Sequence, residues 1–279
     1  MSIAPGLRLA SGKLPHELLS RLLSGLPSED PRVVVGPRVG EDAAVIDMGE
    51  SYLVAKTDPI TFATGRLGWY GVHINANDVA CMGAEPKWFL ATVLLPEGGT
   101  TEALAEEIFN DIREACKTLG VTLCGGHMEV TLGLPRPILV GQMLGEVEKE
   151  GLIRGDGARP GDNLILTKGI PIEGTALMAG EREEVLRKSF GDEVVDRARE
   201  MLVEPGISVV PDALTAARSA EVHAMHDPTE GGLATGVHEL ALASGVGALI
   251  QRERVPVLPE GEAFCSHFGL DPLGVIASG

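Results

Sequence analysis

The stretch from Gly71 to Pro86, GVHINANDVACMGAEP, constrains the fold of this chain more than any other segment. At helical spacing Asn75 and Asp78 lie three residues apart and share one face, while apolar and small residues fill the rest. Gly83 and Pro86 then favour the end of the helix, because glycine accepts a left-handed conformation and proline cannot continue the hydrogen bonding. The stretch therefore predicts either a helix that presents its polar face to a metal or phosphate, or an ordinary helix whose polar face meets water.

The segments around this helix alternate as in an α/β unit. Asp42 precedes one expected strand and Asp58 follows the next, so a hairpin would bring both carboxylates to the same end of a sheet. Divalent cations such as Mg²⁺ bind clustered oxygen ligands of this kind, although aspartate also favours turns by itself. The strands expected in this half are 33–35, 43–48, 52–56, 87–95, 121–130 and 138–147, with a helix from Thr100 or Thr101 to Gly120.

A charged, glycine-rich segment at 148–162 predicts a boundary between two domains. We therefore expect an N-terminal helix and loop in 1–30, a first domain in 31–150, and a second α/β domain in 151–279 whose completeness the sequence leaves open. In the second domain the expected strands are 163–167, 222–226 and 246–251, and the expected helices are 173–179, 184–189, 192–202, 211–220, 233–244 and 260–268.

Composition excludes several classes of function. The net charge is −17 without a cluster of Lys and Arg, which disfavours binding to nucleic acid. No apolar run approaches the ~20 residues of a membrane span, and the N-terminus lacks a signal-peptide pattern, so we expect a cytoplasmic protein and no membrane partner. The four cysteines form no C-x-x-C pair, and we expect buried, reduced thiols rather than a zinc site; they are Cys81, Cys116, Cys124 and Cys265.

Two further segments carry candidate ligands. Lys13, in a glycine-containing segment, either reaches a phosphate or is an ordinary solvated lysine, and no P-loop motif surrounds it. The corner HDPTEGG places Asp227 and Thr229 just before an expected helix start, whose free N–H groups can bind an anion. For His226, beside Asp227, a structural role is the favoured interpretation.

Five motifs, in order, resemble those of the aminoimidazole-ribonucleotide (AIR) synthetase superfamily of ATP-binding enzymes: GEDAAVI, TDPI, NANDVACMGAEP, GGHMEV and HDPTEGGLA. HDPTEGGLATGVHELA and GLDPLGV look most like the HypE-type hydrogenase-maturation branch. The resemblance implies a two-domain PurM-like α/β (α+β) fold, in which the first domain contributes strands to a β-barrel shared by a homodimer and the second is an α/β sandwich. It also implies ATP between the domains and Mg²⁺ held by acidic residues.

By motif, Asp42, Asp58 and Asp78 match the carboxylates that hold metal and phosphate in the superfamily. Gly125 and Gly126 match a glycine turn of the superfamily, and His127 stands where relatives carry an aspartate after it. Either Glu129 substitutes, or His127 contacts phosphate or substrate, or it is a corner histidine. The full set expected to bind nucleotide is Lys13, Asn75, Asn77, Gly125, Gly126, His127, Asp227 and Thr229, and the set expected to bind metal is Glu41, Asp42, Asp58, Asp78 and Asp227.

The resemblance implies ATP-dependent activation of a carbonyl, amide or phosphate oxygen by phosphoryl transfer, on a small-molecule or protein-borne substrate. Such chemistry depends on positioning and charge neutralisation rather than on a protein nucleophile. The alternatives are a phosphotransferase like thiamine-monophosphate kinase and a nucleotide-binding regulatory protein without turnover. HypE-type relatives carry a cysteine on a C-terminal tail, whereas this sequence ends at Gly279 without one. We therefore expect a shortened relative that binds ATP but carries no carbamoyl group on its own cysteines.

Overall fold

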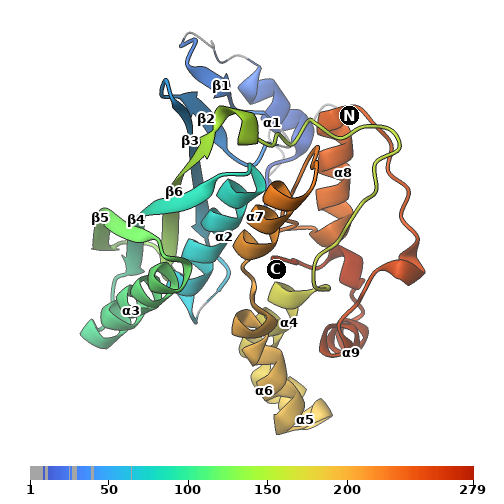
Figure 1. Cartoon of the computed structure of the whole chain (residues 1–279). Helices are drawn as coiled ribbons and strands as arrows, with labels where there is room; N and C mark the ends of the chain where they lie inside the picture. Colours follow the sequence, from blue (N-terminus) through green and yellow to red (C-terminus); the bar gives the residue numbers. More distant parts are fainter. Residues whose placement is uncertain (1–8, 10–11, 25, 27–29, 39–40, 64) are drawn as a thin grey trace.

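A six-stranded mixed sheet organises the N-terminal half of the chain (Figure 1). The computed structural model describes residues 9, 12–24, 26, 30–38, 41–63 and 65–279. The strand order is β1-β2-β3-β6-β4-β5, with only the β4–β5 pair parallel. The strands are β1 (Val33–Val35), β2 (Ala44–Asp47), β3 (Ser51–Ile60), β4 (Glu85–Pro96), β5 (Thr122–Thr131) and β6 (Ile138–Glu148).

Helix α2 (Leu67–Cys81) is buried on one face of this sheet, and α3 (Glu102–Leu119) packs beside it on the same face. Its glycines allow the close approach: a Cβ at Gly68 would lie 2.4 Å from the backbone nitrogen of Ile112 in α3, and a Cβ at Gly71 would lie 2.4 Å from Leu139 in β6. The helix ends just before Gly83, at φ 76°, as predicted. Every residue of α2 is buried, so the alternative of a water-facing polar side is wrong.

The β2–β3 hairpin places Asp42 and Asp58 at the same end of the sheet, as the sequence predicts. One detail differs, because β3 extends beyond 56 and contains Asp58 rather than ending before it. The extension follows from the partner strand, since β6 continues to pair with β3 and sets Asp58 opposite Gly141.

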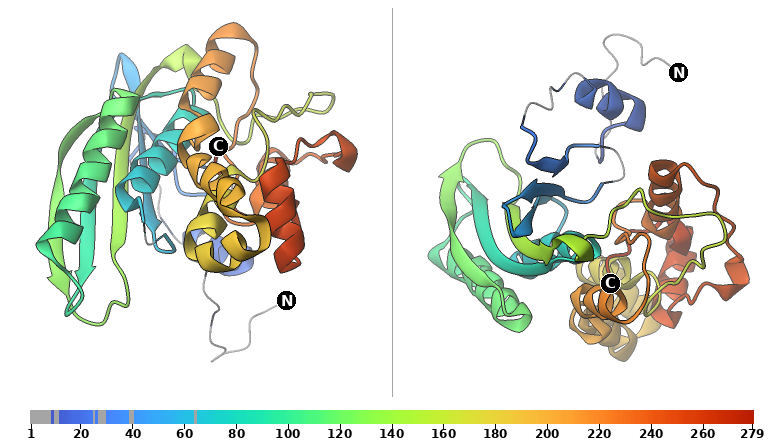
Figure 2. Two further views of the ribbon diagram at one scale, coloured as in Figure 1. Left: turned by 90° about the horizontal axis from the view of Figure 1, so that it is seen from below. Right: turned by 45° about the horizontal axis from the view of Figure 1, so that its top comes forward.

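The C-terminal half is mainly helical, and the six helices expected there are confirmed within two residues at their ends. Figure 2 shows these helices on the opposite side of the molecule from β4, β5 and α3. The N-terminal helix is α1 (His16–Leu23), and the six are α4 (Ile172–Glu181), α5 (Glu183–Phe190), α6 (Asp192–Glu200), α7 (Val210–Ser219), α8 (Gly232–Ser244) and α9 (Pro259–Phe268). In the described part of the chain, no helix is both long and apolar enough to cross a bilayer.

The three strands expected in this half, 163–167, 222–226 and 246–251, are wrong. Among the described residues, the only bridge outside the sheet is the isolated pair Ile170–Val257. Apolar alternation favours extended backbone, but a strand also requires a partner for its hydrogen bonds. Without partner strands these segments leave apolar side chains in solvent: Ile165 is 81% exposed and Leu249 is 91% exposed.

Candidate functional site

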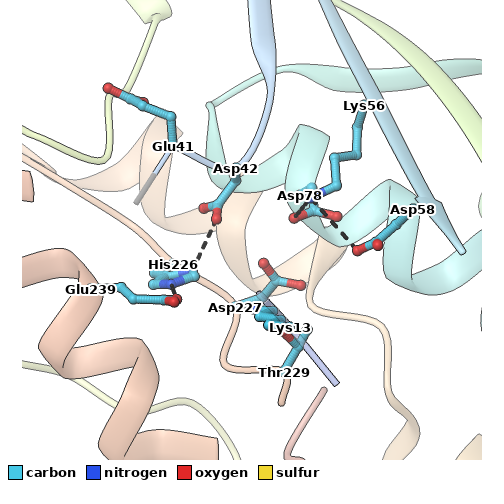
Figure 3. A pocket seen from close by; sticks show the side chains of 10 residues that line it. All are labelled: Lys13, Glu41, Asp42, Lys56, Asp58, Asp78, His226, Asp227, Thr229 and Glu239. Atoms are coloured by element: carbon cyan, nitrogen blue, oxygen red, sulfur yellow. Dashed lines mark hydrogen bonds and ion pairs between the residues drawn. The ribbon is translucent and has the colours of Figure 1, made fainter. Parts of the chain in front are cut away.

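An acidic cavity of about 160 Å³ lies where the two halves of the chain meet (Figure 3). Its walls come from the segment before α1, the β2–β3 hairpin, α2, the corner before α8, and α8 itself. Six of its ten lining residues carry carboxylates, so the cavity favours cations. The lining residues are Lys13, Glu41, Asp42, Lys56, Asp58, Asp78, His226, Asp227, Thr229 and Glu239.

The cavity brings together seven of the residues predicted for metal or nucleotide binding. Their side chains enter the cavity from four separate segments, so residues that are far apart in the sequence meet in the fold. These residues are Lys13, Glu41, Asp42, Asp58, Asp78, Asp227 and Thr229.

On one side of the cavity, Lys56 pairs with two aspartates. Its Nζ donates to Asp78 Oδ1 at 2.9 Å and lies 3.7 Å from Asp58 Oδ2. Burial lowers the pKa of Lys56, but Asp78 and Asp58 outweigh it and raise that pKa above its usual value. Burial also raises the pKa of both aspartates, against the opposing charge of Lys56.

On the other side, Asp227 is 2% exposed, and neither of its carboxylate oxygens has a hydrogen-bond partner among the described residues. Burial raises the pKa of Asp227 well above its ordinary value, and the nearby charges of Asp78 and Asp42 add to the shift. Ligand atoms of Asp42, His226 and Asp227 lie within 4.8 Å of one another. A buried carboxylate without a partner is costly, so this corner is suited to a bound cation.

His226 joins two carboxylates across this corner. Its Nδ1 lies 3.1 Å from Asp42 Oδ1, and its Nε2 lies 3.0 Å from Glu239 Oε2. Burial lowers the pKa of His226, but Asp42 and Glu239 outweigh it and raise the pKa well above its usual value. The His226 ring therefore bridges Glu239, through a hydrogen bond, and Asp42, through an ion-pair contact, at the edge of the cavity (Figure 3).

Lys13 lies at the rim, with 48% of its side chain exposed. Its Nζ donates to Thr229 Oγ1 at 3.2 Å and lies 3.4 Å from Glu230 Oε2. The segment before α1 is thereby joined to the corner before α8, and an ammonium group stands at the mouth of the cavity.

The two predicted asparagines lie outside the cavity lining, inside α2. Asn75 Nδ2 donates to the backbone oxygen of Gly71 at 2.8 Å and to that of Asp58 at 3.3 Å. Asn77 Nδ2 donates a hydrogen bond to the backbone oxygen of Ile207, and its Oδ1 accepts one from the backbone nitrogen of Val209, in the other half of the chain. Both side chains are fully buried, and their contacts stabilise the position of α2.

The residues Gly125, Gly126 and His127 also lie away from the cavity, on the edge strand β5. The expected glycine turn is wrong, because β5 runs straight through both glycines with a bulge beside Cys124. Gly126 has φ 151°, and a Cβ there would lie 2.0 Å from the Ala91 oxygen, so close strand pairing requires the glycine. The exposed His127 ring bonds Glu129 at 3.1 Å.

Three lining residues were outside the predicted sets: Lys56, His226 and Glu239. Lys56 could have been found, because residues two apart in a strand share a face and Asp58 follows it at that spacing. For His226 the sequence favours a structural role, although this residue directly precedes Asp227. Glu239 lies seven residues into α8, and nothing in its local sequence points to the cavity.

The cysteines are free, and none lines the cavity. Cys81, Cys116 and Cys265 are buried as predicted, whereas Cys124 is exposed. The prediction for Cys124 is wrong because β5 is an edge strand with most of its residues in solvent.

Comparison with known proteins identifies the family. The models for the N-terminal and C-terminal domains of AIR synthase related proteins match residues 40–147 and 159–279. The carbamoyl dehydratase HypE of Cupriavidus necator is 33% identical over 252 residues, which cover 87% of this chain and 68% of that protein.

Two solved structures share the fold. One is the hydrogenase maturation protein HypE in complex with ATP, with a TM-score of 0.66, 26% identity, and coverage of 93% of this chain and 75% of that one. The other is AaThiL complexed with AMPPCP and TMP, with a TM-score of 0.71, 21% identity, and coverage of 94% and 80%. The chain therefore has the two-domain PurM-like fold and belongs to the AIR synthase related protein family, near its HypE branch.

Proposed function

We propose that this protein binds ATP together with Mg²⁺ in the acidic cavity and activates a carbonyl, amide or phosphate oxygen by phosphoryl transfer. The observation that carries the proposal is the buried, unpartnered carboxylate of Asp227 beside Asp42 and Asp78, in a cavity lined from both halves of the chain. The ATP complex of the related HypE structure supports the choice of nucleotide.

The donors present fit Mg²⁺, because this ion takes carboxylate oxygens and keeps several waters. Asp42, Asp78 and Asp227 would hold it, since all three line the cavity and Asp227 and Asp78 each offer an oxygen without a described partner. When bound, the ion neutralises charge on the phosphates of the nucleotide.

The chain's own cations and helix ends would position the phosphates. Lys13 stands at the mouth of the cavity, where its ammonium can exchange Thr229 for a phosphate oxygen. Helix α8 begins at Gly232, directly after this corner, and its first N–H groups favour an anion. Phosphoryl transfer needs such positioning more than it needs a protein nucleophile.

The acceptor in our proposal is a small-molecule or protein-borne group that enters the cavity from solvent. Carbamoyl transfer onto one of the four cysteines in this sequence is disfavoured, because none of them lines the cavity. Cys81 is the thiol most affected by the cavity charges, and burial raises its pKa well above the ordinary value, so it stays a thiol.

We also propose that two copies of the chain pair through the sheet. Helices α2 and α3 pack against one face. The opposite face carries the half-buried apolar side chains of Trp88, Leu90 and Leu144, and β5 leaves its edge open. A barrel closed by a second copy of the chain would cover both the apolar sheet face and the open edge of β5.

The test of the proposed function combines binding and turnover. A thermal-shift series with ATP, ADP, GTP and no nucleotide, each with Mg²⁺ or EDTA, should show stabilisation by ATP with Mg²⁺. Phosphate release is then measured with a panel of carbamoyl, amide and phosphate-ester acceptors, and one acceptor should accelerate it. Binding without release for any acceptor would favour the regulatory alternative, and transfer onto a phosphate ester would favour the phosphotransferase. Absence of any nucleotide effect would contradict the proposal.

A further inference from the structure

The Lys56 ammonium occupies a position between two carboxylates of the cavity. Its Nζ lies 2.9 Å from Asp78 Oδ1 and 3.7 Å from Asp58 Oδ2. The side chain of Lys56 is 19% exposed and that of Asp78 is 5% exposed, so solvent screens this contact little. Figure 3 shows Lys56 extending from β3 toward both aspartates, on the side of the cavity opposite His226.

The two carboxylate oxygens of Asp78 have different surroundings. Oδ1 accepts from Lys56, while Oδ2 is buried and has no partner among the described residues. Asp42 and Asp227 also line the cavity, and both oxygens of Asp227 are buried without a partner among the described residues. A carboxylate that bridges two adjacent cations is the arrangement of a two-metal site, in which the ions lie about 3.5–4 Å apart.

We propose that Lys56 is a built-in cation that replaces one metal ion, so that this cavity takes a single divalent cation, beside Asp227, Asp42 and Asp78 Oδ2. The inference deepens the proposed metal site and rests on it. The lysine permanently compensates one of the two charges of the Asp58–Asp78 pair, whereas neither oxygen of Asp227 has a hydrogen-bond partner among the described residues, and this corner loads a metal from solution.

The inference predicts how the number of bound ions changes when the lysine is removed. Lys56→Met keeps the length of the side chain and removes its charge, which leaves the Asp58–Asp78 pair free for a second ion. The experiment counts Mn²⁺ bound per chain from the EPR signal of free Mn²⁺, without nucleotide. Wild type should bind one ion and Lys56→Met one ion more.

Two variants serve as controls for this count. Lys149→Met removes a lysine that pairs with Asp47 at 2.7 Å, outside the cavity lining, and should leave the count at the wild-type number. Lys56→Met/Asp58→Asn removes the free carboxylate together with the lysine and should also return the count to the wild-type number.

Equal counts for wild type and Lys56→Met would overturn the inference. Should Lys56→Met fail to fold, wild-type crystals soaked in Mn²⁺ decide the question by anomalous scattering. One peak beside Asp227 is expected, and a peak between Asp58 and Asp78 would overturn the inference. Because no nucleotide is used, failure of ATP binding is seen separately in the experiments on the proposed function.

Discussion

The side chain of Asn77 joins the two halves of the chain: its Nδ2 donates to the Ile207 oxygen at 2.8 Å, and its Oδ1 accepts from the Val209 nitrogen at 2.8 Å. Both bonds lie in the buried interior, where no water replaces a lost partner.

Replacing this residue should therefore destabilise the protein. Asn77→Ala leaves two buried backbone groups unsatisfied, and we expect the free energy of unfolding to fall by about 2–4 kcal/mol. Urea denaturation measures the change. The matched control is Asn110→Ala on the exposed side of α3, which should change stability by less than about 0.5 kcal/mol. Similar denaturation midpoints for both variants would contradict a structural role for Asn77.

Without metal, the cavity should destabilise the fold as the pH rises. The folded-state pKa of Asp227 is raised by burial and by Asp78 and Asp42, so folded protein keeps a proton that the unfolded chain loses above pH ~4. That stability is present below pH ~4 and is lost as the pH rises through the raised folded pKa. In EDTA at pH 8, Asp227→Asn should exceed wild type by about 1–3 kcal/mol.

Melting temperatures at pH 5 and pH 8, in EDTA and in Mg²⁺, check this prediction. The advantage of Asp227→Asn should shrink at pH 5, where more of the wild-type carboxyl is protonated. Mg²⁺ should stabilise wild type and leave the variant unchanged. Parallel pH curves for the two proteins, with equal responses to Mg²⁺, would show that Asp227 carries no buried charge.

His226 should act on metal affinity through Asp42. It holds Asp42 Oδ1 at 3.1 Å while Glu239 holds its other nitrogen at 3.0 Å. His226→Gln should weaken Mn²⁺ binding by about 10–100-fold, the usual effect of removing a group that orients a ligand. The control is His223→Gln, since His223 pairs with Asp162 and Glu221 outside the cavity lining. An affinity unchanged in His226→Gln, or equally reduced in both variants, would rule out the orienting role.

Light scattering should show a dimer at micromolar protein. Leu144 belongs to the apolar sheet face opposite α2, so Leu144→Glu should give a monomer by placing a charge in the proposed interface. Leu249→Glu, at a side chain that is 91% exposed, should leave the dimer intact. A wild-type monomer would contradict the shared barrel.

The sequence could predict the convergence of Asp42, Asp58 and Asp78, because a hairpin and a polar helix face fix where these side chains emerge. The position of Lys56 at the cavity could also be predicted, because alternate residues of a strand share a face and Lys56 lies two residues before Asp58. The contacts of Asn77 could not be predicted, because its partners are backbone groups about 130 residues away.

The remaining differences between the expected and the observed structure also depend on pairing between segments that are far apart in the sequence. Gly126 looked like part of a turn, but its role is close pairing with Ala91 of β4. The segments 163–167 and 246–251 have the apolar pattern of strands, yet pattern alone does not supply a neighbouring strand. The domain boundary at 148–162 stays a prediction.

The most direct test of the proposed ATP and Mg²⁺ site is the Mg²⁺ dependence of ATP binding, measured with a fluorescent ATP analogue in Mg²⁺ and in EDTA. Wild type should bind the analogue at least about tenfold more tightly with Mg²⁺ than in EDTA, and Asp227→Asn should lose this difference. Asp156→Asn is the control, because Asp156 pairs with Arg154 outside the cavity lining. Equal affinity in Mg²⁺ and EDTA for wild type, or an undiminished Mg²⁺ effect in Asp227→Asn, would contradict a metal site at Asp227.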